Sequence, residues 1–245
     1  MTEQYHMSSH DGTYTRNFKA RVDAIFPGIM ELDKTAFYPL GGGQPSDVGC
    51  IKWDTGTAIV TDVRKKNRIR HMFEGDAPEV GQVVQGEIDW NRRYSHMKMH
   101  TSQHLISAVV SDIYGSDTVG NQIGEEKSRI DFKPLKISQS ELNTIEDRVN
   151  DYICKDLKVE ISEELRSNLE NNKEIRSSMS SGLWKMLPRS VTKLRVISIG
   201  DIDICPCAGT HVKSLKEIGK ISFTKKENKG SQKLRLSYNL SDIDS

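Results

Sequence analysis

The sequence predicts an α+β protein with two domains, a small N-terminal β-barrel over residues 1–89 and an α+β domain over residues 90–245. Two observations lead to this fold class. Short β-rich runs separated by turn signals fill residues 14–89, and this spacing is typical of a small barrel. At Asp89 the pattern changes to a long helical segment, which is followed by further helix and strand signals.

The barrel strands are β-rich runs bounded by turn residues, and they are expected at 18–26, 29–33, 50–65, 68–73 and 82–89. The Gly-rich segment YPLGGGQPSDVG interrupts this series at 38–49. Its consecutive glycines predict a tight turn, because glycine adopts positive φ without steric cost.

The second domain opens with a predicted helix. Asp89 is a good N-cap residue, and Gly115 suits the position just after the last helical turn. Between them, Leu105, Val109 and Ile113 repeat at helical spacing. We therefore expect one uninterrupted helix across this segment.

The remaining elements alternate between strands and a second helix. A loop or hairpin is expected at 120–133, and Ser138 with Glu141 forms a capping-box pattern that opens a helix to about Leu157. Later strands are expected at 193–200 and 220–239, the last of them a hairpin that turns near 227–231.

Composition and charge favour a cytoplasmic globular protein. Charged residues make up 28% and hydrophobic residues 36% of the 245 residues, and the net charge is +1. No apolar run approaches the roughly 18 residues of a membrane span, and the N-terminus is too polar for a signal peptide. Basic clusters at 63–70 and 91–100 are typical of solvated surface. If RNA binds at the second cluster, Arg92, Arg93 and Lys98 would contact phosphates.

The cysteines and histidines indicate a metal site. Cysteines clustered in a reducing compartment more often bind metal than form disulfides. Cys207 and His211 are four residues apart, and so are His100 and His104 on the predicted helix, where this spacing places both imidazoles on one face. Nitrogen and thiolate ligands in a tetrahedral set suit Zn²⁺, so these four residues predict one zinc ion.

Two neighbouring residues are weaker candidates. His96 extends the helical series, but each four-residue step drifts about 40° around a helix, so we expect it beside the ligands. Cys205 would break the Cys-x3-His spacing, and we expect it to be a buried residue beside Pro206. Whether the ion is structural or catalytic stays open, since catalytic zinc usually keeps three protein ligands and a water.

Four segments carry a family resemblance: LDKTAFYPLGGGQPSDVG (32–49), IDWNRRYSHMKMHTSQHL (88–105), GNQIGEEKSRIDF (120–132) and CAGTHV (207–212). They resemble the AlaX family of freestanding alanyl-tRNA editing proteins, which are relatives of the editing domain of alanyl-tRNA synthetase. The Gly-rich segment is similar to the medium-length class, in which a β-barrel precedes the editing domain. Ala208 departs from the family pattern, where glycine is usual. Its Cβ would perturb the loop if the position needed positive φ or a close approach of the backbone to the aminoacyl group.

The resemblance implies a zinc-containing editing domain of the type common to threonyl- and alanyl-tRNA synthetases. It implies ATP-independent hydrolysis of the ester that links a wrong amino acid, chiefly serine, to tRNA(Ala); removal of glycine stays open. A zinc ion can polarise the ester carbonyl, anchor the substrate or lower the pKa of a bound water. The partner is then the acceptor end of tRNA(Ala), with no membrane and no obligate protein partner.

The resemblance also nominates three substrate-contacting residues. Thr35 and Gln122 would read the serine hydroxyl or shape the pocket; by residue type alone they would be a strand residue and a turn residue. Gln44 would orient water or substrate, because glutamine is not a general base at neutral pH. Two rival functions stay open: a zinc-stabilised RNA-binding module without catalysis, and a metallohydrolase of another small ester.

Overall fold

The computed structural model describes residues 2–171 and 189–242. The chain divides into two compact units, Met1–His96 and Met97–Ser245, and the division falls inside helix α3 (Trp90–Tyr114). Within the described ranges, every helix is too short or too polar to cross a membrane.

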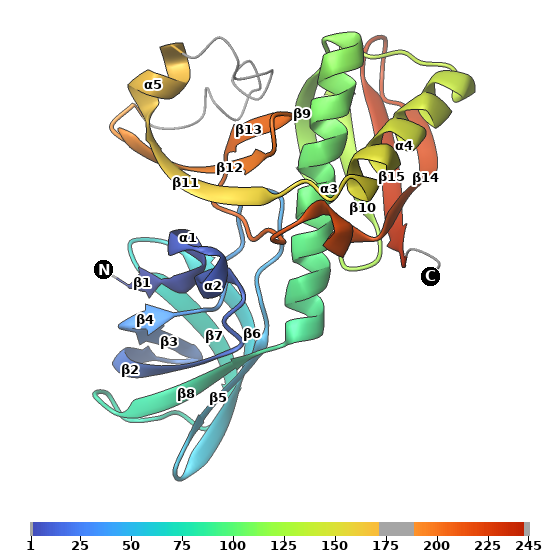
Figure 1. Ribbon diagram of the computed structural model, residues 1–245. Helices are drawn as coiled ribbons and strands as arrows, with labels where there is room; N and C mark the ends of the chain where they lie inside the picture. The colour runs from blue at the N-terminus through green and yellow to red at the C-terminus, as the bar shows by residue number, and fades with distance from the viewer. Residues whose placement is uncertain (1, 172–188, 243–245) are drawn as a thin grey trace. The chain divides into compact units, whose positions relative to one another are not determined.

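The N-terminal unit contains the closed β-barrel that the sequence predicts (Figure 1). Its strands follow the order β2-β3-β7-β6-β5-β8, and each neighbouring pair is antiparallel. The strands are β2 (Asn17–Phe26), β3 (Ile29–Leu32), β5 (Gly49–Trp53), β6 (Gly56–Lys65), β7 (Ile69–Gly75) and β8 (Val83–Ile88).

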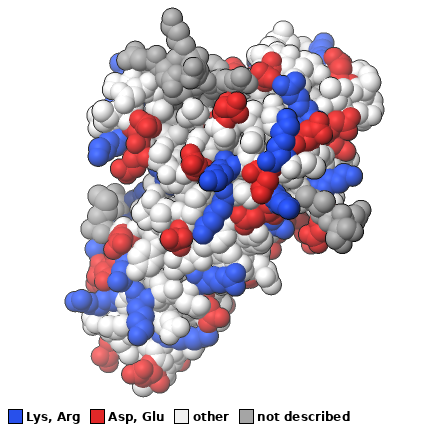
Figure 2. All heavy atoms as spheres, viewed as in Figure 1, with Lys and Arg blue, Asp and Glu red and all other residues white. Residues whose placement is uncertain are grey.

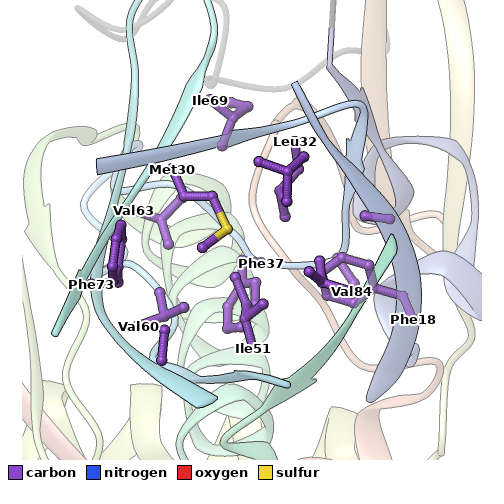
Figure 3. Close-up of a cluster of buried hydrophobic side chains, with 14 of the residues drawn as sticks. Phe18, Met30, Leu32, Phe37, Ile51, Val60, Val63, Ile69, Phe73 and Val84 are labelled. Atoms are coloured by element: carbon purple, nitrogen blue, oxygen red, sulfur yellow. The ribbon is translucent and has the colours of Figure 1, made fainter. Parts of the chain in front are cut away.

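Alternating side chains fill the barrel. Along β2, Phe18, Ala20 and Val22 are buried while the residues between them are exposed, as expected of a strand with one face on a core. Figure 3 shows such side chains from several strands converging inside the barrel, among them Met30 and Val60. The barrel therefore has its own hydrophobic core.

Several short elements of this unit were not predicted. Strand β1 (Glu3–Gln4) pairs in parallel with β4 (Lys34–Thr35), and α1 (Tyr5–Ser8) and α2 (His10–Thr13) are single helical turns. Ser9 caps α2 by accepting a hydrogen bond from the Gly12 amide at 3.2 Å. Such turns are too short to produce a hydrophobic period in the sequence.

The Gly-rich segment forms the tight turn that the sequence predicts. The amide of Gln44 donates to the carbonyl of Gly41 at 2.9 Å, and the reverse bond measures 3.2 Å. Gly42 and Gly43 between them have φ values of +58° and +82°. Positive φ at both central residues defines a turn that favours glycine, which explains the glycine run.

Helix α3 begins and ends as predicted. The Asp89 side chain accepts a hydrogen bond from the Arg92 amide at 3.1 Å, which is N-cap geometry. At the other end, Gly115 has φ +59° and its amide donates to the carbonyl of Ser111 at 2.8 Å. A residue with a side chain would be strained at that φ, so Gly115 ends the helix.

The C-terminal unit contains an antiparallel sheet in the order β14-β15-β10-β9, with α3 and α4 (Gln139–Cys154) on one face of it (Figure 1). The strands are β9 (Asp117–Gln122), β10 (Ser128–Lys133), β14 (Lys220–Asn228) and β15 (Leu234–Ser241). The predicted hairpin of β14 and β15 is confirmed, and the segment 120–133, expected as a loop or hairpin, belongs to the hairpin of β9 and β10. The capping box of Ser138 and Glu141 is present at the start of α4.

Side chains of α4 also bond to the outer edge of β14. Asn150 donates to the carbonyl of Ile221 and accepts from its amide, both at 2.9 Å. Glu146 accepts from the amide of Phe223 at 2.8 Å. These bonds satisfy backbone groups that an edge strand would otherwise present to solvent.

A second, three-stranded sheet carries part of the candidate site. It consists of β11 (Val159–Leu165), β12 (Lys193–Ile199) and β13 (Asp203–Pro206), all antiparallel. Only β12 was predicted. Helix α5 (Arg166–Asn171) and the 3₁₀ helix η2 (Leu215–Ile218) complete the unit. The polar sequence over 167–184 has few signals of regular structure, so α5 was not predicted; residues 172–184 lie outside the described residues.

Surface charge is mixed. Figure 2 shows basic and acidic side chains interspersed on the visible face. In the cluster at 63–70, Arg64 pairs with Asp62, and Arg70 pairs with Glu31 at 3.0 Å. These arginines are therefore neutralised locally, as expected of a solvated surface rather than a strong positive field.

Candidate metal centre

Four side chains from two distant segments meet in the C-terminal unit. His100 and His104 come from α3, and Cys207 and His211 come from the loop that follows β13. One ligand atom from each lies within 4.8 Å of all the others. The structure therefore brings together the four residues predicted as ligands, in a group that could hold one metal ion.

The thiol of Cys207 lies close to two of the ring nitrogens. Cys207 Sγ lies 3.4 Å from His211 Nε2 and 3.7 Å from His100 Nε2. Bond lengths of about 2.0–2.3 Å around a tetrahedral zinc ion imply ligand atoms roughly 3.3–3.8 Å apart. The two separations from Cys207 fall in that range, which is compatible with a tetrahedral ion.

Two residues that the sequence analysis missed hold the imidazoles by their outer nitrogens. Asp203 Oδ2 lies 3.0 Å from His104 Nδ1. Thr101 Oγ1 lies 3.1 Å from His211 Nδ1 and accepts from the Val212 amide at 3.2 Å. The inner Nε2 atoms are thus left to face the cluster. The spacing of Thr101 and Asp203 along the chain carries no ligand pattern, so it offered no signal.

The Cys207 loop is fixed by its backbone. The Cys207 amide donates to the carbonyl of Arg195 at 3.1 Å, and the Arg195 guanidinium donates to the Cys207 carbonyl. The Gly209 amide points at Cys207 Sγ from 3.3 Å. A donor aimed at the sulfur stabilises a thiolate, which is the form that binds metals.

The electrostatics of the group favour a cation. Burial opposes ionisation of Cys207, but the charges of His100 and His211 outweigh it and bring the thiol pKa well below 9.0. Burial also opposes protonation of His104, yet hydrogen bonds to Asp203 and Cys207 raise its pKa to about 10. Burial, reinforced by the charge of His100, lowers the pKa of His211 well below 6.5. The Cys207 thiolate and the Asp203 carboxylate thus favour positive charge in this buried group, which a protonated His104 or a bound cation would supply.

The residues near the cluster agree only in part with what the sequence predicted for them. Cys205 lies on β13 outside the four-residue group, but it is half-buried rather than buried as expected. Ala208 is exposed, and positive φ among the described residues with a side chain occurs only at Asp156. The φ of Ala208 therefore does not require glycine. His96 is buried and lies outside the four-residue group.

Thr35 lies in the N-terminal unit, fully buried. Its hydroxyl lies 2.9 Å from His71 Nε2 and accepts from the Phe37 amide at 3.1 Å. The other ring nitrogen, His71 Nδ1, lies 3.1 Å from the carbonyl of Met30. Donation from Nδ1 to that carbonyl leaves Nε2 to accept from Thr35, so the hydroxyl has both a donor and an acceptor role within its own unit.

The two glutamines occupy different environments. Gln44 is buried beside the Gly-rich turn. Gln122 is exposed at the end of β9, where its Oε1 accepts from Arg129 Nε at 2.9 Å. Their roles toward a substrate stay predictions. For Arg93 the expected phosphate contact is wrong, because the side chain is fully buried and ion-paired with Asp47.

Two parts of the chain match known sequence families. Residues 194–237 match the "Threonyl and Alanyl tRNA synthetase second additional domain", and residues 7–92 match "tRNA synthetases class II (A)". Together with the barrel and the His/Cys cluster, these matches define a class: domains related to aminoacyl-tRNA synthetases.

Full-length relatives narrow the class. The chain is 34% identical over 239 residues to the alanyl-tRNA editing protein AlaX-M of Methanosarcina barkeri, covering 94% of this chain and 96% of that protein. It is 34% identical over 226 residues to AlaX-L of Pyrococcus horikoshii, covering 91% of this chain and 52% of that protein. It is 36% identical over 227 residues to the alanine–tRNA ligase of Pyrobaculum neutrophilum, of which it spans 25%. The chain belongs to the AlaX family of alanyl-tRNA editing proteins.

Proposed function

We propose that the chain is a trans-editing hydrolase that releases serine from mischarged tRNA(Ala), with Zn²⁺ as its metal. The observation that carries the proposal is the convergence of His100, His104, Cys207 and His211 in a member of this family. The relatives' names supply the substrate class, alanyl-tRNA, and editing implies removal of a wrong amino acid.

Zinc is proposed from the donor set. Three imidazole nitrogens and one thiolate within 4.8 Å of one another suit Zn²⁺ better than Mg²⁺ or Ca²⁺, which prefer oxygen ligands. When bound, zinc would supply Lewis acidity toward the ester carbonyl or an attacking water. An aminoacyl ester is already activated, so no strong nucleophilic side chain is required.

The chain's own residues would orient the metal ligands and the substrate. Asp203 and Thr101 hold His104 and His211 by their outer nitrogens, which keeps the ligand geometry rigid. Gln122 is proposed to face the substrate from β9. Because the Thr35 hydroxyl is engaged with His71, we propose that Thr35 shapes its segment rather than bonding to serine directly.

We further propose that residues 1–89 act as an accessory barrel domain and residues 90–245 as the editing domain. The acceptor end of tRNA(Ala) is the proposed partner, in the cytoplasm. Removal of glycine from tRNA(Ala) by the same chemistry is the natural second substrate, since glycine is smaller than serine and meets no added steric barrier.

The experiment compares substrates that differ only in the amino acid. Zinc-loaded protein is incubated with serine, glycine and alanine esters of tRNA(Ala), and release of the amino acid is followed. Rapid loss of serine with retention of alanine supports the proposal. Ser-tRNA(Ala) that survives a high concentration of protein with confirmed zinc content contradicts it.

One observation favours a rival. Four protein ligands resemble a closed structural zinc site, which would suit an RNA-binding module without catalysis. That rival predicts saturable binding of tRNA(Ala) without release of any amino acid. A third possibility, a general esterase, predicts equal hydrolysis of serine esters with and without the tRNA.

A further inference from the structure

Asp203 and His104 form a contact that links two elements of the C-terminal unit. Asp203 lies on β13 and His104 on α3, 99 residues apart in the sequence. Asp203 Oδ2 lies 3.0 Å from His104 Nδ1, and the two side chains are only 9% and 5% exposed. Water therefore competes little with this hydrogen bond.

The contact fixes which nitrogen of His104 is available. An ionised carboxylate only accepts hydrogen bonds, so Nδ1 must carry the proton. Nε2 is then the His104 atom left to join the cluster with Cys207 and His211, and it can bind an ion once its own proton has left. A carboxylate on the outer nitrogen also makes an imidazole a stronger metal ligand.

The fold alone does not explain a carboxylate at this place. The backbone of Asp203 pairs with Ile199, and this pairing is independent of the side chain. Burying a carboxylate is costly unless it has a strong partner, and an apolar side chain would fill the position at lower cost. The partner present is a proposed metal ligand, so the interaction has a use beyond packing.

Strand β13 also leads directly to Cys207. The bond from the Cys207 amide to the Arg195 carbonyl continues the pairing of β13 with β12. Strand β13 thus carries the group that orients one ligand, and the residue directly after the strand is another ligand. A shift of this strand would move both Asp203 and Cys207. It would therefore affect the α3 ligand His104 and the loop ligand Cys207 together.

We propose that Asp203 is a positioning residue for metal binding, which sets the tautomer and the ring orientation of His104. The proposal rests on the metal site under "Proposed function" but not on the reaction. It predicts that Asp203 controls metal affinity even in the absence of any tRNA.

The test measures metal affinity in Asp203→Ala and Asp203→Asn. Zn²⁺ is titrated against a chromophoric chelator, and Co²⁺ substitution reports the ligand field. Removal of the carboxylate in the Ala variant is expected to weaken binding about 10–100-fold and to alter the cobalt spectrum. The Asn variant keeps an acceptor without the charge, so its loss should be smaller but measurable.

Asp201→Ala is the matched control. Asp201 is also an aspartate and lies in the turn directly before β13, but it is exposed. Its variant should bind Zn²⁺ like the wild type. The melting temperature of the metal-free proteins distinguishes a purely structural role of Asp203 from a role in metal binding. A purely structural role would lower the melting temperature of Asp203→Ala without changing its affinity for Zn²⁺.

Wild-type affinity in either folded Asp203 variant overturns the proposal. If Asp203→Ala does not fold, the Asn variant decides alone. Because protein and metal are measured without substrate, a failure here is distinct from a failure to hydrolyse Ser-tRNA(Ala).

Discussion

Arg93 and Asp47 form an ion pair in the interior of the N-terminal unit. Arg93 Nε lies 3.0 Å from both carboxylate oxygens, and neither side chain reaches solvent. The same guanidinium donates to the carbonyls of Thr13 at 2.7 Å and Ala36 at 2.6 Å. Asp47 also accepts from the amide of Tyr38 at 2.6 Å. One buried cation thus joins α2, the segment after β4 and the flank of the Gly-rich turn.

Removing one partner of this pair should destabilise the protein strongly. Asp47→Ala leaves the Arg93 charge buried without its carboxylate, which typically costs about 3–5 kcal/mol. Urea denaturation measures the change. The control is Glu87→Gln, which breaks the exposed pair with Lys52 and should have little effect. Equal midpoints for Asp47→Ala and the wild type would contradict the prediction.

His71 predicts a pH dependence of stability. Burial lowers its pKa from 6.5 to about 4. The unfolded chain takes up this proton near pH 6.5 whereas the folded chain does so near pH 4. Stability should therefore fall as the pH drops from 6.5 to 4, by about 3 kcal/mol in total. Urea midpoints plotted against pH over this range should have a flatter slope in His71→Gln than in the wild type. An unchanged slope would show that His71 does not cause the pH dependence.

Thr101 should affect metal binding through His211. Thr101→Val removes the oxygen that lies against His211 Nδ1 and accepts from the Val212 amide. We expect affinity for Zn²⁺ to fall by about 10–100-fold. Thr101→Ser keeps the hydroxyl and serves as the control. A Val variant with wild-type affinity would show that His211 needs no such support.

Loss of a ligand should remove both metal and activity. His104→Ala is expected to lose bound zinc and the release of serine from Ser-tRNA(Ala). Zinc at 100 times its Kd should stabilise the wild type by about 2.7 kcal/mol, and this gain should vanish in the variant. Thermal unfolding with and without zinc measures it. The control is Cys154→Ser, an exposed cysteine outside the cluster, which should respond to zinc like the wild type.

Thr35 should affect discrimination rather than metal content. Thr35→Val leaves the Phe37 amide and His71 Nε2 without the hydroxyl, at a cost of about 1–3 kcal/mol. We expect full zinc content and a changed ratio of serine to alanine release. Thr35→Ser keeps the hydroxyl and should preserve the ratio. Wild-type discrimination in a zinc-loaded Val variant would refute the nominated role.

The fold was predictable where local chemistry decides the structure. The N-cap of Asp89, the stop at Gly115 and the capping box at Ser138 each depend on a few adjacent residues, and all are confirmed. Strands β11 and β13 were missed, because each is held by its pairing with β12 rather than by a strong pattern of its own.

The candidate ligands were predictable because Cys-x3-His and His-x3-His spacings are local. Asp203 and Thr101 were not, since their relation to the imidazoles arises only when β13 and the loop after it fold onto α3. Arg93 was misjudged for a similar reason. An arginine in a basic run suggests solvent, and only the tertiary structure places a carboxylate next to it.

The bonds from α4 to β14 have a consequence for self-association. An unpaired strand edge can template the addition of a strand from another molecule, which leads to aggregation. Here Asn150 and Glu146 occupy the outward backbone groups of Ile221 and Phe223. Addition of a strand at this point of β14 is therefore blocked for as long as α4 stays docked. Partial detachment of α4 would expose the edge of β14.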